Sequence, residues 1–149
     1  MGVAKKVLKG EHRERENLSI AFVVPAEIQK LNKKYRHKDK PTDVLAFEKV
    51  SDFKDEYAEV IICPEYIREQ AKESKLPLKK ELAFRLIHGI LHVLGYDHER
   101  SAAEEKRMFE RQEYYFSKIW NSQLKIQKQF KILNSKIVFK FIILNYYHG

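Results

Sequence analysis

The chain has almost no cysteine, and glycine and proline are scarce. Its 149 residues contain one cysteine, Cys63, with five glycines and four prolines. One cysteine excludes an intramolecular disulfide framework and a cysteine-rich zinc ribbon, and it suits a reducing cytoplasm. Because glycine and proline are few, no flexible linker divides the chain, and we expect a single hydrophobic core.

Long hydrophobic runs are also missing. The first 15 residues carry five basic side chains and lack the apolar stretch that a secretory signal needs. The most apolar segment, residues 137–144, contains Lys140 and is much shorter than the roughly 20 residues that span a bilayer. We therefore predict no signal peptide, no transmembrane helix, no membrane partner and a cytoplasmic location.

Acidic residues are absent from the end of the chain. None follows Glu113, whereas residues 114–149 hold six lysines. The whole chain has a formal net charge of +8, but residues 1–113 nearly balance, with 23 basic against 21 acidic side chains. We place a domain at residues 1–120 and a basic extension at residues 121–149, for which an added helix, an RNA-binding arm and a poorly ordered tail remain alternatives.

Apolar periodicity predicts strands that alternate with helices. Apolar, β-branched runs bounded by proline or polar loops indicate buried strands, and spacings of three to four residues indicate amphipathic helices. We expect strands at 18–24, 44–47 and 59–63, and helices at 26–35, 64–75, 78–94 and from a Ser101–Glu104 capping box through Ile119. This order predicts a mixed sheet packed with helices, in the α+β or α/β class.

Three histidines, His88, His92 and His98, lie in one short segment. His88 and His92 are four residues apart, so on a helix both imidazoles project from one face about one turn apart. Gly95 allows the helix to end and the chain to bring His98 back as a third metal ligand. Three neutral imidazoles leave one position of a tetrahedral zinc open, as in catalytic sites. Metal-free histidines are the alternative, but burying them without partners costs free energy.

The spacing His-x-x-x-His-x-x-Gly-x-x-His is also that of the metzincin zinc peptidases. Those enzymes place a glutamate directly after the first ligand as the general base, and this chain has Gly89 there. Because glycine cannot accept a proton, a zinc metalloprotease is the least favoured hypothesis.

The segment His88–His98, His-Gly-Ile-Leu-His-Val-Leu-Gly-Tyr-Asp-His, closely resembles the signature of the bacterial YbeY family of metal-dependent endoribonucleases. Residues 31–47 resemble that family's Tyr-Arg-x-Lys-Asp-x-Pro-Thr-Asp-Val-Leu-Ser-Phe block, and residues 58–64 resemble its Gly-Asp/Glu-Ile-Val-Ile-Cys strand. The three segments keep the family's order, and the likeness runs from about residue 18 to residue 120.

The resemblance implies an α+β fold in which a metzincin-like helix helps to hold one zinc ion at His88, His92 and His98. It also implies a functional Arg36 and a hydrolase that cuts single-stranded RNA. Such an endoribonuclease would act in ribosomal RNA processing, including maturation of the 16S rRNA 3′ end, and in ribosome quality control. The implied partners are the small ribosomal subunit and its assembly factors. A non-catalytic RNA- or ribosome-binding assembly factor with a structural metal is the alternative.

Four other residues near these motifs each have two possible roles. Arg36 offers a forked, permanent cation suited to phosphate, or it is a solvated charge or an ion pair with Asp39. Lys38 either contacts a backbone phosphate or is simply solvated. Tyr96 either stacks on an RNA base or packs over the helix end. Asp97 either orients a histidine or bonds to the backbone of the turn.

Overall fold

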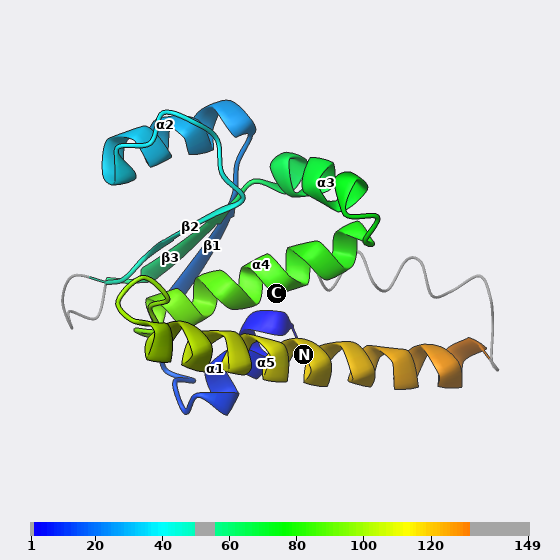
Figure 1. Cartoon of the computed structure of the whole chain (residues 1–149). Helices are drawn as coiled ribbons and strands as arrows, with labels where there is room; N and C mark the ends of the chain where they lie inside the picture. Colours follow the sequence, from blue (N-terminus) through cyan, green and yellow to red (C-terminus); the bar gives the residue numbers. More distant parts are fainter. Residues whose placement is uncertain (1, 50–55, 132–149) are drawn as a thin grey trace.

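The structure is a computed structural model that describes residues 2–49 and 56–131, with the side chains of the last helix described up to residue 121. Figure 1 shows the arrangement of its helices and strands. In chain order they are α1 (Val3–Gly10), β1 (Leu18–Phe22), α2 (Pro25–Arg36), β2 (Val44–Phe47), β3 (Ala58–Ile62), α3 (Pro64–Glu73), α4 (Leu78–Val93) and α5 (Ala102–Lys131).

The strands form a mixed sheet with β3 in the middle. The order is β1-β3-β2. β3 runs parallel to β1, with Ile20 opposite Val60, and antiparallel to β2, with Leu45 opposite Ile61. A small mixed sheet with five helices in the described residues confirms the α+β class, and the predicted strands lie within a residue or two of the observed ones.

The two faces of the sheet belong to two hydrophobic clusters. Side chains of successive strand residues point to opposite faces. Val60 and Ile62 join the larger cluster, which includes buried residues of α1, α4 and α5. Ile61 and Cys63 join a smaller one with Ile28 of α2. Helix α4 therefore packs on one face of the sheet, with α1 and α5 behind it, and α2 covers the other face (Figure 1).

Helix α4 lies at the centre of the fold and carries the predicted wide apolar face. It contacts both β2 and β3 and also α1, α3 and α5. The helix ends before Gly95, whose φ of 94° is the left-handed conformation predicted at this position. Its buried residues are Ala83, Leu86, Ile87, Gly89, Ile90, Leu91 and Val93.

The two terminal helices differ from expectation. No element was assigned from the sequence before residue 18, and the structure has α1 there, with Val3, Val7 and Leu8 buried in the main core. At α5 the predicted cap is present, because the Glu104 amide donates to Ser101 Oγ at 3.2 Å. Helix α5 continues across position 120 to Lys131, and residues 132–149 of the predicted extension lie outside the described residues.

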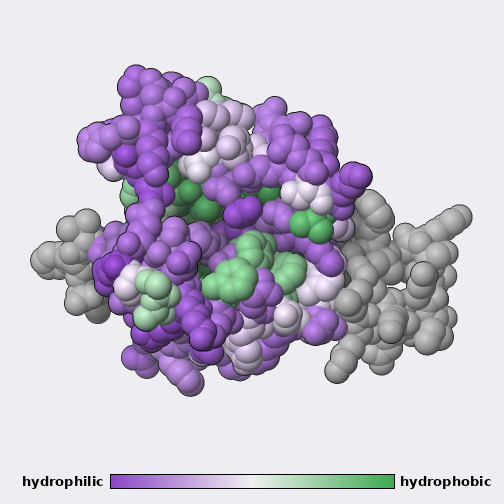
Figure 2. Space-filling view, viewed as in Figure 1, coloured by the Kyte–Doolittle hydropathy of each residue, from purple (hydrophilic) through white to green (hydrophobic). Residues whose placement is uncertain are grey.

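The surface of the molecule is mainly polar around α2. Figure 2 shows hydrophilic residues over α2 and hydrophobic residues exposed between α2 and α5. The last turn of α2 carries three cations, Lys33, Lys34 and Arg36. Within the part of the chain that the structure describes, no helix combines the length and the apolar character needed to cross a bilayer.

Candidate metal centre

The three histidines of the motif come together at the end of α4. His88 and His92 lie one turn apart on this helix, and His98 approaches from the loop that follows Gly95. The ring centroids are 4.7 Å apart for His88 and His92, 5.3 Å for His88 and His98, and 4.9 Å for His92 and His98. One nitrogen of each ring lies within 4.8 Å of the others. The structure thus groups the three side chains as the sequence predicted.

The electrostatics favour neutral imidazoles at His88 and His92. Burial, with repulsion by His88 and His98, lowers the pKa of His92 to about 4. Burial also lowers the pKa of His88, and this outweighs the hydrogen bond between His88 Nδ1 and Gln112 Oε1, which raises it. Both rings are therefore uncharged at neutral pH and keep a lone pair for a metal.

The donor set fits a zinc ion. Zinc–nitrogen bonds of about 2.0–2.1 Å at tetrahedral angles place ligand nitrogens about 3.3 Å apart. The three histidine nitrogens, all within 4.8 Å of one another, approach that spacing and need only small ring movements to reach it. With the three ligands found among the described residues, a bound zinc would have a fourth position for water or substrate.

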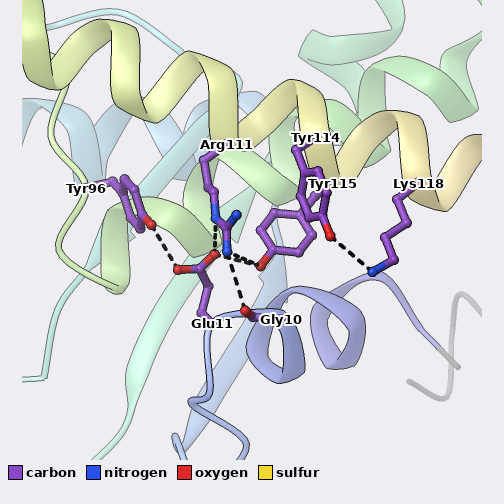
Figure 3. A network of polar contacts seen from close by, with 7 residues as sticks. All are labelled: Gly10, Glu11, Tyr96, Arg111, Tyr114, Tyr115 and Lys118. Carbon is purple, nitrogen blue, oxygen red and sulfur yellow. Dashed lines mark hydrogen bonds and ion pairs between the residues drawn. The ribbon is translucent and has the colours of Figure 1, made fainter.

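The loop that carries His98 is tied to the end of α1 by the partly buried carboxylate of Glu11. Tyr96 Oη donates to Glu11 Oε2 at 2.9 Å, while Arg111 Nε and Tyr115 Oη donate to Glu11 Oε1 at 2.5 Å and 2.6 Å (Figure 3). Burial raises the pKa of Glu11, but these hydrogen bonds and the Arg111 charge lower it further than burial raises it. Tyr96 is partly buried against the main core and bonded to Glu11, and its contact with an RNA base stays a prediction.

Asp97 supports the turn between Tyr96 and the third histidine. Its Oδ1 accepts the Glu99 amide proton at 2.8 Å, and Oδ2 lies 3.1 Å from Arg100 Nε. The hydrogen bond from Glu99 is the main reason that the pKa of Asp97 is lowered. These contacts correspond to the predicted bond with the turn backbone.

Arg36 is the last residue of α2 and lies near the metal centre. Its Nη2 is 3.2 Å from Glu99 Oε1, next to His98 in sequence, and its charge helps to lower the pKa of His92. Asp39, considered as a partner for Arg36, instead accepts from Lys33 at 2.6 Å. Arg36 remains 44% exposed, so its guanidinium is accessible to a ligand.

Lys38 follows α2 closely and is exposed to solvent. Its backbone amide donates to Asn32 O at 3.3 Å, just beyond the left-handed residue His37 that ends the helix. The structure therefore places this lysine on the segment that carries Arg36, with its side chain at the surface.

Sequence reasoning assigned no role to Gln112. This side chain is 3% exposed on α5, with Oε1 3.0 Å from His88 Nδ1 and Nε2 donating to Phe84 O at 3.2 Å. The sequence contained one signal for such a role: Gln112 lies between the apolar residues Met108 and Tyr115 on the buried side of a predicted helix. A buried polar group needs a hydrogen-bond partner, so this glutamine could have been expected to contact one.

The packing of Gly89 was also missed. A Cβ atom at Gly89 would lie 2.7 Å from Val60 Cγ1 and 3.0 Å from Val44 Cγ2. This position is therefore turned toward the sheet, where a glutamate would enter the core. The structure supports the argument that this chain does not use a base directly after its first ligand.

Comparisons with known proteins agree with this architecture. A family model described as Endoribonuclease YbeY matches residues 2–120. A relative named Endoribonuclease YbeY from Thermotoga neapolitana is 43% identical over 105 residues, covering 70% of this chain and 68% of the relative. Its counterpart from Persephonella marina is 40% identical over 119 residues, covering 77% of this chain and 78% of the relative.

A solved structure agrees with the fold as well. The solution structure of a Thermotoga maritima protein superposes with a TM-score of 0.61 at 33% identity, covering 91% of this chain and 85% of the other. The match of residues 2–120 spans the sheet, α4 and its three histidines, so fold and motif point to one conclusion. The chain belongs to the endoribonuclease YbeY family.

Proposed function

We propose that this protein is a zinc-dependent endoribonuclease that cuts single-stranded RNA. The observation that carries the proposal is the convergence of His88, His92 and His98 beside an accessible Arg36. Membership of a family whose relatives are named as endoribonucleases supports the same activity. One zinc ion per chain, bound by the three imidazoles, is the cofactor that suits these ligands.

The chemistry divides between the histidines and Arg36. When bound, zinc would polarise a phosphoryl oxygen and stabilise the negative charge that develops as a phosphodiester is cleaved. The low pKa values of His88 and His92 keep these ligands unprotonated. Arg36 exchanges the Glu99 carboxylate for a phosphate, because its forked guanidinium binds two oxygens of either group. Lys38 adds a phosphate contact from the same segment.

The biological setting of the proposal is ribosomal RNA. We place the protein in the cytoplasm, acting in maturation of the 16S rRNA 3′ end and in ribosome quality control, with the small ribosomal subunit and its assembly factors as partners. The single cysteine supports a reducing compartment, and the net charge of +8 supports a polyanionic partner.

Changing His92 to alanine tests the metal centre. We expect His92→Ala to lose bound zinc and cleavage of a single-stranded RNA, because two imidazoles no longer enclose the ion. The control is His12→Asn, which changes a histidine outside the group at a left-handed position that asparagine tolerates. Metal content and gel-resolved RNA fragments, with and without chelator, are the measurements. A metal-free His92→Ala protein that cleaves normally contradicts the proposal.

Changing Arg36 to alanine separates substrate contact from metal binding. We expect Arg36→Ala to keep its zinc and to lose about a hundredfold or more of cleavage, as expected when a transition-state charge loses its donor. Arg68→Ala, which removes an exposed arginine of α3, is the matched control. Normal cleavage by Arg36→Ala would show that Arg36 does not contact the scissile phosphate.

The basic extension is proposed to add affinity for RNA. Residues 121–149 hold five lysines. Each phosphate contact to a single strand contributes about 0.7 to the slope of log affinity against log salt. Replacing the five lysines by glutamine should reduce this slope by up to about 3.5, and replacement by arginine should not. An unchanged slope in the glutamine variant removes the role of the extension.

The assays also distinguish the alternative of a non-catalytic assembly factor. A protein that retains zinc and binds RNA or the small ribosomal subunit, but produces no fragments from any single-stranded RNA, would be such a factor. The group that the described residues form has three histidine ligands, which favours the enzyme because structural zinc sites usually carry four protein ligands.

A further inference from the structure

Gln112 links α5 to the first histidine of the metal centre. It is one of two buried polar residues among the described residues, the other being Asn32. Its amide reaches α4 with both ends, since Oε1 lies 3.0 Å from His88 Nδ1 and Nε2 lies 3.2 Å from the Phe84 carbonyl oxygen. A buried amide held at both ends has one orientation available.

The hydrogen-bonding chemistry fixes that orientation. The Phe84 carbonyl oxygen accepts hydrogen bonds and cannot donate, so the amide end that faces it must be the NH₂ group. With the amide reversed, two acceptor oxygens would face each other and the NH₂ group would face His88. The observed arrangement satisfies both ends of Gln112, and it turns the oxygen Oε1 toward the imidazole.

The same chemistry then fixes the tautomer of the histidine. Oε1 of Gln112 only accepts, so His88 Nδ1 must carry the proton that is shared between them. A neutral imidazole has one N–H group, and its Nε2 therefore holds the free lone pair. Neutral histidine in water prefers the opposite tautomer, so an unsupported ring would more often present an N–H group at Nε2 instead of a lone pair.

We propose that Gln112 is a positioning residue that holds His88 in the Nδ1–H tautomer and directs the Nε2 lone pair to a metal. This inference rests on the proposed function, because it takes His88 as a ligand. The carboxylates and carbonyls that hold metal-binding histidines in other proteins play the same part, and losing them typically costs 10- to 100-fold in metal affinity. Here a glutamine does so from a different helix.

Three variants of the full chain test the proposal. Gln112→Met keeps the approximate size of the side chain and removes the oxygen acceptor. Gln112→Glu keeps an oxygen that faces His88 Nδ1. Met108→Ala, at a position 1% exposed one turn earlier on α5, loosens the same helix packing without touching the amide, and it controls for a general loss of order.

Two readouts are needed, and one of them involves neither metal nor RNA. Long-range proton–nitrogen NMR spectra of metal-free protein, at a pH where histidine is neutral, report which ring nitrogen of His88 is protonated. The His88 signals are assigned by their loss in His88→Gln. Zinc affinity is measured by competition with a chromophoric chelator, and far-UV circular dichroism verifies that each variant is folded.

We expect the Nδ1–H tautomer in the wild type, in Gln112→Glu and in Met108→Ala. We expect Gln112→Met to shift toward the Nε2–H tautomer and to bind zinc about 10- to 100-fold more weakly. If Gln112→Met retains the wild-type tautomer and affinity, or if Met108→Ala loses as much affinity, the inference is overturned. A wild type with the Nδ1–H tautomer but no zinc binding contradicts the proposed function and supports the tautomer assignment.

Discussion

Replacing Gly89 with alanine would test how closely α4 must lie on the sheet. The added Cβ would be 2.7 Å from Val60 Cγ1 and 3.0 Å from Val44 Cγ2, closer than carbon atoms normally approach. Val60 is fully buried in the central strand, and its β-branched side chain has few rotamers, so its methyl groups cannot simply turn away. The helix and the strand must therefore move apart.

Two opposing effects set the size of the change. Alanine is about 1 kcal/mol more favourable than glycine inside a helix. Forcing an extra methyl group into a close-packed core costs about 1–3 kcal/mol. We expect Gly89→Ala to lower the free energy of unfolding by about 1 kcal/mol, which corresponds to a decrease of about 3 °C in Tm for a chain of this length.

Urea unfolding of four metal-free proteins isolates the contact. The set is the wild type, Gly89→Ala, Val60→Ala and the double variant. Shortening Val60 costs about 2 kcal/mol alone, but it removes the methyl group that the new Cβ meets. The double variant should therefore be more stable than the sum of the single changes predicts, by about 1 kcal/mol. Additive changes, or a Gly89→Ala protein more stable than the wild type, would refute the reasoning.

Three further predictions concern the rest of the site. Because the pKa of His92 is about 4 in the folded protein against 6.5 ordinarily, the unfolded chain takes up a proton first as the pH falls. Protonation of His92 in the unfolded chain should therefore lower the unfolding free energy of the metal-free protein by about 2 kcal/mol between pH 7 and pH 5. Urea titrations of His92→Gln should not show this loss. Glu11→Gln weakens the charge-assisted hydrogen bonds that Tyr96, Arg111 and Tyr115 donate to this carboxylate. It should lower the unfolding free energy by about 2 kcal/mol at pH 7. Since the pKa of Glu11 is lowered, its stabilisation is present above its usual value of 4.5 and is lost in acid, so wild type and Glu11→Gln should converge in thermal melts below that pH. Gly95→Ala places a side chain at a φ of 94° and should cost about 1 kcal/mol in the same melts, with weaker zinc binding because His98 shifts.

The parts of the fold that local sequence determines could be predicted. The strand expected at residues 44–47 is observed as Val44–Phe47, and the helix expected at residues 78–94 as Leu78–Val93. The relation of His88 to His92 depends only on helical periodicity, and the left-handed Gly95 depends only on its missing side chain. These features involve residues a few positions apart, where spacing in sequence determines spacing in space.

Other parts depend on contacts between distant segments. Arg36 meets Glu99 across 63 positions, and Gln112 meets His88 across 24. Neither contact can be predicted from sequence periodicity, because both depend on how whole helices pack against each other. Helix α1 has eight residues, too few for stability by itself, so it forms because Val7 is buried in the core.

The three candidate ligands are held by different parts of the molecule. Gln112 on α5 contacts the His88 ring, and His92 lies on α4, which packs closely on the sheet at Gly89. The bond from Tyr96 to Glu11 ties the His98 loop to the end of α1. A metal needs all three ligands at once, and ordering a loose ligand lowers the affinity. Helix α1 therefore supports the loop that carries the third ligand, although it contributes no ligand itself. A chain that lacks residues 1–17 keeps every histidine of the motif, and we expect it to lose the ordered third ligand and with it tight zinc binding.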